Sequence, residues 1–481
     1  MKEEKTTYKF KTKPWAHQLM ALDYLYPRDV AALYTDMGTG KTKIMIDLIV
    51  NRGFKFVLIC CTNKGCAVWE KQISIHSDIR SEMVLNLAGV SSEEKVSRLT
   101  EKASRLKFVQ ESDPLIVIVN YEGVWRKPFA NTLLKMGCKG LIDAVICDES
   151  HRIKSPSSKC SWFLKSIGNK VQHRYLVTGT PLAENPMDVY AQYRFLDPTI
   201  FGTRFNDFKA RYQNLDVQKS ARVGFPVLDK NTPYINLDEL QEKMFSCAFM
   251  AKSSVELPKR LNIVKTFQLG KKAARAYDEV TKEGVLIEKA GTLEISSVLT
   301  LSIRQQQLTS GFVPLETDDK QKIIKRLDRS RIEELQELLD GLGEEPVVVF
   351  ARFRSDLTQI RKLCKEMGIG YSELSGKHDD HDVWLNGKTQ VLGVQYTSGS
   401  ESVDLTRAHY CIYYSLTNSL ALYLQSKKRI HRPGQTKPVI YYYLVANIGK
   451  KDSIDRTILE ALQKKKDVTE YILQKGFENN L

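Results

Sequence analysis

The sequence predicts an α/β chain with two mainly parallel sheets, and three observations carry this prediction. Short apolar runs recur along the chain without strict alternation of apolar and polar residues, as in strands covered on both faces. Stretches of helical length with one apolar face lie between these runs. The pattern occurs twice, up to about residue 200 and again from about residue 345. Strands that alternate with helices indicate a parallel sheet flanked by helices in each half.

The individual elements follow from these runs. The predicted strands are 54–61, 115–120, 141–147, 174–177, 347–350, 390–394, 410–414 and 439–445. The clearest predicted helices are 41–51, 182–195, 331–342 and 357–367. In the more charged middle of the chain, apolar residues at helical spacing predict helices at 239–249, 271–290 and 298–307. Gly, Pro and Asn within 223–233 indicate a loop.

Length and charge limit the organisation of the chain and its partners. A chain of 481 residues is too long for one hydrophobic core and is expected to form a few domains. Lys and Arg number 72 against 57 Asp and Glu, which gives a formal net charge of +15. This surplus favours a polyanionic partner, although a basic protein without such a partner also fits the charge.

The cysteines and the first residues indicate an intracellular protein. The nine cysteines contain no C-x-x-C pair, and their odd number fits neither a disulfide framework nor a zinc site. Cys60, Cys61, Cys147 and Cys411 lie inside apolar runs, so we expect reduced cysteines in the core. No secretory signal follows Met1, and no apolar run reaches membrane-spanning length, so no membrane contact and a cytoplasmic location are expected.

Residues 36–42, with the sequence DMGTGKT, have the composition of a phosphate-binding loop before a helix. The glycines allow backbone N–H groups to wrap a triphosphate, and the start of the helix adds partial positive charge. Lys41 would reach the β and γ phosphates, and the Thr42 hydroxyl would bind Mg²⁺. The full phosphate-loop pattern has another glycine where Thr35 stands, so the segment alone also fits an ordinary loop.

Two polar segments follow later predicted strands. Asp148 and Glu149 end the run 141–147, where the first carboxylate could hold Mg²⁺ and the second could act as the base on the attacking water. Taken alone, they also fit an acidic turn. Residues 178–181 (TGTP) follow the next strand and could link hydrolysis to movement, or Thr180 could cap a helix. A strand ending in Asp-Glu after a phosphate loop favours a nucleotide-hydrolysing site.

The most informative segment of the second half is 425–435 (QSKKRIHRPGQ). Arg429 and Arg432 are three residues apart, so on one helix they would face the same way, and Pro433 would help to end that helix. Arginines brought to a γ-phosphate stabilise its developing charge. The alternative is a basic, solvated helix face. Together with Lys41, the arginines predict an ATP site split between two lobes.

With these motifs in this order, the chain resembles the superfamily-two helicases and, more narrowly, the Swi/Snf-like DNA translocases. The strongest matching segments are 36–42, 148–154, 178–181 and 425–435, and weaker ones are 14–18, 119–122, 257–260 and 350–353. The resemblance covers residues from about 10 to 465. With no appended domain expected after the second lobe, the chain looks like the compact motors of phages, bacteria and plasmids.

The resemblance implies two RecA-like lobes with helical insertions between them. The expected boundaries are 1–265 for the ATP-binding lobe with an insertion near 197–250, 266–328 for a helical linker, and 329–481 for the second lobe. ATP would bind in the cleft and close it, and hydrolysis would reopen it. Each cycle would move the grip along duplex DNA.

The resemblance also assigns the site residues. Those expected in catalysis are Lys41, Glu149, Arg429 and Arg432, and those expected to hold Mg²⁺ are Thr42 and Asp148. The residues expected to bind ATP are Gln18, Asp36, Met37, Gly38, Thr39, Gly40, Lys41, Thr42, Asp404 and Gln425. The chain departs from the family at 398–405, where Glu401 replaces part of a glycine-rich loop and would repel a phosphate.

The implied function is ATP-dependent translocation on double-stranded DNA, with remodelling of protein–DNA complexes or of branched or forked DNA. The alternatives are a strand-separating or annealing helicase, the motor subunit of a restriction or defence system, and a clamp without ATPase activity. Candidate DNA contacts, each of which also fits a packing role, are Lys64, Trp69, Tyr121, Arg152, Lys154, Arg352 and Trp384.

Overall fold

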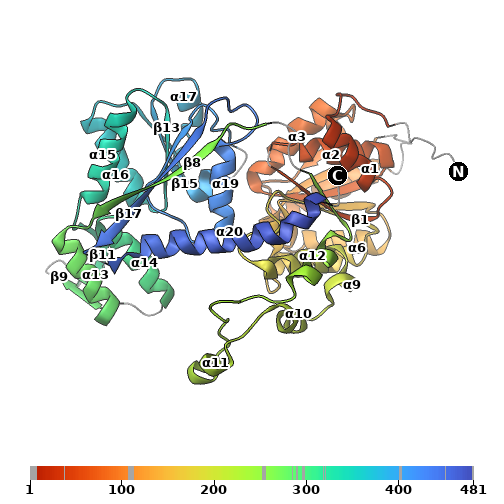
Figure 1. Ribbon diagram of the computed structural model, residues 1–481. Helices are drawn as coiled ribbons and strands as arrows, with labels where there is room; N and C mark the ends of the chain where they lie inside the picture. Colours follow the sequence, from red (N-terminus) through yellow and green to blue (C-terminus); the bar gives the residue numbers. More distant parts are fainter. Residues whose placement is uncertain are drawn as a thin grey trace. The chain divides into compact units, whose positions relative to one another are not determined.

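The computed structural model describes residues 8–36, 38–106, 113–251, 256–283, 285–288, 291–294, 298–317, 319, 321–399, 403–449 and 451–478. The chain divides into two compact units, one of residues 1–255 with 467–481 and one of residues 256–466. Figure 1 follows the chain through both units by colour. The lobe boundaries expected from the sequence stay a prediction.

The first unit is built on a seven-stranded sheet in which all neighbours pair in parallel, in the order β3-β4-β2-β5-β6-β1-β7. Its strands are β1 (Val30–Thr35), β2 (Phe56–Cys61), β3 (Val84–Asn86), β4 (Leu115–Asn120), β5 (Ala144–Asp148), β6 (His173–Val177) and β7 (Ala248–Ala251). Since β1, β5 and β6 are neighbours, the loops after them meet at one edge of the sheet.

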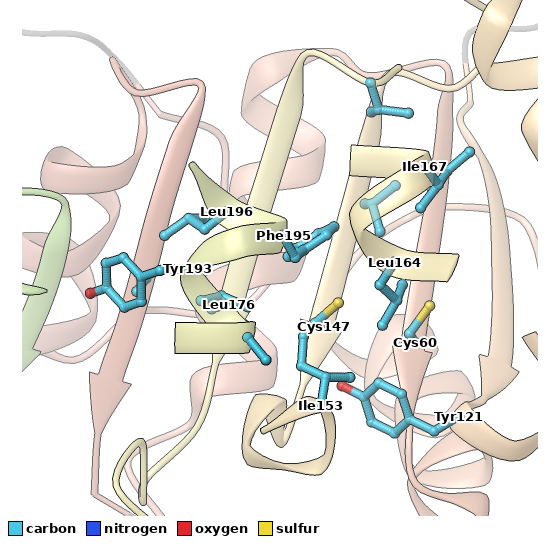
Figure 2. Close-up of a cluster of buried hydrophobic side chains, with 14 of the residues drawn as sticks. Cys60, Tyr121, Cys147, Ile153, Leu164, Ile167, Leu176, Tyr193, Phe195 and Leu196 are labelled. Atoms are coloured by element: carbon cyan, nitrogen blue, oxygen red, sulfur yellow. The ribbon is translucent and has the colours of Figure 1, made fainter. Parts of the chain in front are cut away.

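Helices cover both faces of this sheet. The helices of this unit, not all of which lie on the sheet, are α1 (Ala16–Leu25), α2 (Lys41–Arg52), α3 (Asn63–His76), α4 (Ser92–Leu106), α5 (Tyr121–Val124), α6 (Phe129–Cys138), α7 (Lys159–Gly168), α8 (Val189–Leu196), α9 (Pro198–Phe201), α10 (Phe205–Tyr212), α11 (Val217–Val223) and α12 (Leu237–Phe245), with 3-10 turns at Ser81–Met83, Ser150–Ile153 and Pro186–Asp188. In Figure 2, Leu164 of α7 and Phe195 of α8 lie over Cys60, Cys147 and the neighbouring strands. The expected burial of Cys60, Cys61, Cys147 and Cys411 is confirmed, and all four are free thiols.

Three strands of the first sheet, β1, β3 and β7, were not predicted. β1 contains Ala31 and Ala32, which have little intrinsic preference for strands, yet it lies between β6 and β7 with both faces covered. The helix predicted at 239–249 is wrong at its end, because α12 stops at Phe245 and β7 then pairs with β1. The helix predicted from residue 182 begins only at Val189, after the Pro186 turn.

The second unit holds a seven-stranded sheet in which β8 and β18 both pair with β17. Its strands are β8 (Arg260–Gln268), β13 (Val347–Ala351), β14 (Tyr371–Leu374), β15 (Val391–Gln395), β16 (Tyr410–Tyr413), β17 (Val439–Ile448) and β18 (Lys451–Asp452). All pairs are parallel except β17 with β18. The associated helices are α13 (Lys271–Glu283), α14 (Val298–Thr309), α15 (Ser330–Leu342), α16 (Arg354–Glu366), α17 (His381–Leu385), α18 (Tyr396–Gly399), α19 (Leu420–Ile430) and α20 (Ile454–Glu478).

The middle of the chain is less helical than predicted. A four-stranded antiparallel sheet is formed by β9 (Val285–Glu288), β10 (Gly291–Glu294), β11 (Phe312–Glu316) and β12 (Lys322–Arg326). The helix predicted at 271–290 ends at Glu283, because Val285, Leu286 and Ile287 pair with β10. The predicted class, α/β with two parallel-sheet lobes of the RecA-like type, is nevertheless confirmed.

The C-terminal helix α20 contributes residues to both units. Ile472 is fully buried in the core of the first unit, and its carbonyl accepts a hydrogen bond of 2.9 Å from Gln241 Nε2 of α12. The Tyr471 hydroxyl donates to Asp238 at 2.7 Å. Within the described part of the chain, no helix combines the length and apolarity needed to cross a membrane.

A buried ion pair joins α15 to the start of α20 in the second unit. Arg331 and Asp455 are paired, and each side chain is only 2% exposed. Asp455 also accepts hydrogen bonds from the Thr309 hydroxyl at 3.0 Å and from the Ala446 N–H at 3.1 Å. Arg331 Nε donates to the Thr309 carbonyl at 3.0 Å. Every partner of this charge pair therefore belongs to the core of the unit.

We expect Asp455→Ala to lower the free energy of unfolding of the second unit by about 3–5 kcal/mol, because Arg331 would keep a buried charge without its partner. Urea denaturation of the full chain, followed by circular dichroism, measures this loss. The control is Asp452→Ala, which removes an exposed carboxylate paired with Arg456 and should cost less than about 1 kcal/mol. Equal losses in the two variants would contradict the expectation.

Candidate active site

The loop between β1 and α2 has the backbone shape of a phosphate-binding loop. Gly38 and Gly40 have φ angles of 80° and 78°, which residues with a Cβ atom rarely adopt. A Cβ on Gly40 would also come within 2.3 Å of Gln18 Nε2. Both positions therefore require glycine. Met37, which was predicted to bind ATP, lies outside the described residues.

Helix α1 supports this loop from one side. Gln18 Nε2 donates to the Thr39 carbonyl at 3.0 Å, and His17 Nε2 lies 2.9 Å from the same oxygen. The Trp15 N–H donates to Gln18 Oε1 at 2.9 Å, so both ends of the Gln18 amide are engaged. The structure thus places Gln18 against the loop, and its expected part in binding ATP stays a prediction.

Lys41 begins α2 and its side chain folds back over the loop. Its Nζ donates to the carbonyls of Thr35 and Asp36, both at 3.1 Å. The Thr39 hydroxyl donates to the Asp36 carbonyl at 2.7 Å, and its oxygen lies 2.9 Å from the Thr35 hydroxyl oxygen. Thr42 lies in the first turn of the same helix, next to Lys41. The ammonium group of Lys41 is therefore held close to carbonyl oxygens of the loop.

Asp148 ends β5 and is fixed by a residue that the sequence did not assign to the site. Trp69 Nε1 of α3 donates to Asp148 Oδ2 at 2.8 Å, and the Glu149 N–H donates to Oδ1 at 3.0 Å. Burial and the neighbouring charge of Glu149 raise the pKa of Asp148 to about 6, although the Trp69 hydrogen bond and the charge of Lys41 oppose this rise. A nearby cation would lower this pKa and so favour the ionised form of the carboxyl.

Glu149 has a left-handed backbone, with φ and ψ both 51°, which costs about 1–2 kcal/mol for a residue with a side chain. The Thr178 hydroxyl donates to Glu149 Oε2 at 3.1 Å, and His151 Nδ1 lies 3.3 Å from the same oxygen. The Thr180 N–H donates to the Thr178 hydroxyl at 3.1 Å. Hydrogen bonds thus link the loops after β5 and β6, and the role of 178–181 in movement stays a prediction.

The predicted arginines lie in the second unit, around α19. This helix ends at Ile430, so Arg432 lies beyond it, and the expectation that Arg429 and Arg432 share one helical face is wrong. Arg429 is buried, and its carbonyl accepts a hydrogen bond of 3.2 Å from the Leu405 N–H. The helix stops early because Pro433 and Gly434 follow closely.

The residues around Asp404 share this part of the second unit. Asp404 Oδ1 accepts from the Thr406 N–H at 2.9 Å and from its hydroxyl at 2.8 Å. Gln435 Nε2 donates to the carbonyls of Ala408 and Thr406 at 2.9 and 3.2 Å. Gln425 is buried in α19. The hydrogen bond from the Leu405 N–H to the Arg429 carbonyl therefore brings the neighbouring Asp404 close to Arg429 along the backbone. Glu401 lies outside the described residues.

Comparison with protein families agrees with this arrangement. Residues 17–311 match the SNF2-related domain, and residues 330–434 match the helicase conserved C-terminal domain. The chain belongs to the SNF2-related family. The predicted resemblance to Swi/Snf-like ATPases of superfamily two is confirmed, and with it the assignment of the chain to the helicase-type ATPases.

Two curated yeast proteins illustrate the relationship. DNA repair and recombination protein RDH54 of Saccharomyces cerevisiae is 23% identical over 92% of this chain and 51% of its own length. The ISWI chromatin-remodeling complex ATPase ISW1 of the same species is 25% identical over 78% of this chain and 33% of its own length. The SNF2-related chain thus spans about half the length of the first relative and a third of the second. A solved structure, the Sulfolobus solfataricus SWI2/SNF2 ATPase core in complex with dsDNA, covers 98% of this chain and 95% of its own at 17% identity and a TM-score of 0.40.

Three of the aromatic residues considered for DNA contact in this SNF2-related chain are buried. Trp69, Tyr121 and Trp384 pack in the two cores, so they present no ring to a nucleic acid. The Tyr121 hydroxyl instead donates to the Asp148 carbonyl at 2.6 Å. Lys154 is partly buried and forms ion pairs, with its Nζ 3.6 Å from Glu184 Oε1 and 3.8 Å from Asp188 Oδ2.

Lys64 and Arg152 remain exposed, and Arg352 is half-buried. Two of the candidate DNA contacts therefore bond Asp148 instead, Trp69 through its carboxylate and Tyr121 through its backbone carbonyl. A tryptophan at the middle of a helix, as Trp69 is, gives no sequence signal for such a role until the fold places it beside β5.

Proposed function

We propose that this SNF2-related ATPase translocates on double-stranded DNA and is driven by ATP hydrolysis between its two lobes. The observation that carries the proposal is the meeting of three strand ends in the first unit. They bring together the glycine loop after β1, the Asp148–Glu149 pair after β5 and Thr178 after β6. The net charge of +15 supports a nucleic-acid partner.

The residues of this edge fit ATP with Mg²⁺. The two glycine positions leave the backbone of the loop open to a phosphate, and Lys41 supplies an ammonium group beside it. Thr42 and Asp148 would hold the Mg²⁺, which would supply charge compensation at the phosphates. A pair of oxygen ligands from the protein suits Mg²⁺, because this ion binds few protein ligands beside phosphate and water.

In this proposal Glu149 is the base on the attacking water. Its hydrogen bond from Thr178 and its contact with His151 set the direction of the carboxylate. Asp148 keeps its negative charge when cations approach, because its pKa of about 6 already lies below neutral pH. Arg429 and Arg432 would stabilise the charge that develops on the γ-phosphate once the lobes close, and Asp404 and Gln425 would contact the nucleotide from their side.

We further propose that the motor remodels protein–DNA complexes or branched DNA. RDH54 and ISW1 are named for DNA repair and chromatin remodelling, and their names support this class of work. The test is the ATPase rate of the purified chain with linear duplex, single-stranded DNA and RNA at one salt concentration. Duplex DNA should stimulate hydrolysis most, and strongest stimulation by RNA would reject the proposal.

Lys41→Ala should lower duplex-stimulated ATP turnover at least a hundredfold, because a preorganised charge at the phosphates is lost. Turnover is measured by phosphate release at saturating duplex. The control is Lys55→Ala, which removes an exposed lysine of the same unit and should leave the rate unchanged. Wild-type protein that binds duplex but shows no Lys41-dependent turnover would favour a clamp without ATPase activity.

A further inference from the structure

Residues 213–236, defined here as the arm, leave the first unit between α10 and α12. Two backbone bridges join the sides of the arm, Gln213 with Tyr234 and Leu215 with Leu228. Figure 1 shows α11 at the far end of the arm, away from the sheet of this unit. The arm is therefore an ordered projection that is held by its own backbone pairing.

The tip of the arm is built by local hydrogen bonds. Asp216 accepts from the Lys219 N–H at 2.9 Å and so caps the start of α11. The Val227 N–H donates to the Ser220 hydroxyl at 2.9 Å. Gly224 ends the helix with a φ of 76°, and the chain then turns back through Phe225. Backbone geometry thus specifies where the Phe225 side chain is presented.

Apolar side chains at this tip have no cover in the first unit. No residue of α11 is buried, and residues 221–226 are all exposed. Val217 is 76% exposed and Phe225 is 63% exposed. An ordered segment that leaves such side chains in solvent points to a binding surface.

The charge of the tip indicates what binds there. Between Val217 and Leu228 the sequence has two cations, Lys219 and Arg222, and no Asp or Glu. Both cations are exposed and lie within six residues of Phe225. Cations that flank an exposed aromatic ring match a nucleic acid, whose phosphates pair with the cations and whose bases stack on the ring.

Linear duplex fits only half of this surface. Its phosphates are available to Lys219 and Arg222, but its bases are stacked on one another and give Phe225 no partner. A fork or junction exposes unstacked bases at the branch point, where an apolar side chain can stack without the unstacking cost that it would meet in linear duplex. The exposed ring of Phe225 beside Lys219 and Arg222 therefore favours branched DNA over linear duplex.

We propose that the arm recognises branched DNA, with Phe225 stacked on an unpaired base at the branch point and Lys219 and Arg222 on the adjacent phosphates. This inference rests on the proposed DNA translocase function and names the class of DNA on which it acts. Aromatic stacking accepts every base, so the recognition is of DNA structure and not of sequence.

The test compares dissociation constants for a forked and a linear duplex of equal length and salt concentration, measured by fluorescence anisotropy. Wild type should prefer the fork. Phe225→Ala should lose about five- to tenfold in fork affinity, in the range expected for one stacked base, and keep its affinity for linear duplex. Phe225→Trp retains an aromatic ring and should retain the preference. Ile324→Ala, which trims an exposed apolar residue of the second unit, is the matched control.

Lys219→Ala with Arg222→Ala should weaken binding to both DNAs and make the salt dependence less steep, because phosphate contacts are lost. A Phe225→Ala variant with the wild-type ratio of fork to linear affinity would overturn the inference and leave the translocase function intact. Failure of wild type to bind or respond to any duplex would reject the translocase function itself. If Phe225→Ala abolished a dimer seen by sedimentation without changing the fork ratio, the tip would be an interface between copies of the chain.

Discussion

Arg432→Ala is expected to bind ATP about as tightly as wild type and to hydrolyse it about a thousandfold more slowly or worse. The reason is that an arginine finger acts on charge present only in the transition state, so its loss spares binding of the ground state. ATP affinity is measured with a fluorescent analogue, and turnover by phosphate release with saturating duplex. Arg432→Lys keeps the charge without the planar fork and should recover little of the rate.

The control for this variant is Lys437→Ala, which removes an exposed cation of the same unit that lies 3.4 Å from Glu345. Its turnover should stay close to that of wild type. Loss of ATP binding together with turnover in Arg432→Ala would instead assign Arg432 a role in the fold, especially if its thermal unfolding midpoint also fell. Because α19 ends at Ile430, the Arg432→Ala substitution leaves every residue of that helix unchanged.

Glu149→Gln should slow turnover by about 10²–10⁴-fold, the range for the loss of a general base, while MgATP still binds. The amide oxygen of glutamine can accept the same hydrogen bond from Thr178, so the side chain keeps its position. The substitution also removes the like charge beside Asp148 and should lower the pKa of Asp148 from about 6. Turnover is measured as for Arg432→Ala, and Asp148 is followed by its titration in NMR spectra.

Glu82→Gln, an exposed carboxylate of the same unit, serves as the control and should behave as wild type. Glu149→Gln turnover within tenfold of wild type would place the base elsewhere. Glu149 also has a strained backbone, so Glu149→Gly tests a separate point. That variant should be as inactive as Glu149→Gln. Its free energy of unfolding should fall less than the loss of the side-chain contacts alone predicts, because glycine adopts a φ of 51° without strain.

The parts of the fold that the sequence predicts well are those decided by continuous apolar runs. β4 matches its predicted range, and β2 and β5 differ by two to three residues at their starts. β1 and β7 escape prediction because their alanines and methionine suit a helix equally, and only pairing with β6 and with each other decides the outcome. β8 is largely exposed, so burial leaves little pattern in its residues.

In the candidate site too, the sequence predicted some features, and others depended on contacts between distant residues. The motifs were sufficient to predict a helix that begins at Lys41 after a glycine loop, and a strand that leads into Asp148 and Glu149. They could not show that Trp69 fixes Asp148, since that contact joins a helix to a strand 79 residues away. They also misplaced Arg432, because a three-residue spacing implies one helical face only where the helix continues. Helix ends depend on local backbone geometry that residue types constrain weakly.

Helix α20 has a consequence for how the protein can be divided. Its residues from 467 onward belong to the first unit, so the second unit is an insertion in the sequence of the first. A fragment that stops at residue 255 would therefore omit Ile472 and open a gap in its own hydrophobic core. An isolated first unit is better made by replacing residues 256–466 with a short glycine–serine linker, so that the terminal segment of α20 is fused back to its own domain.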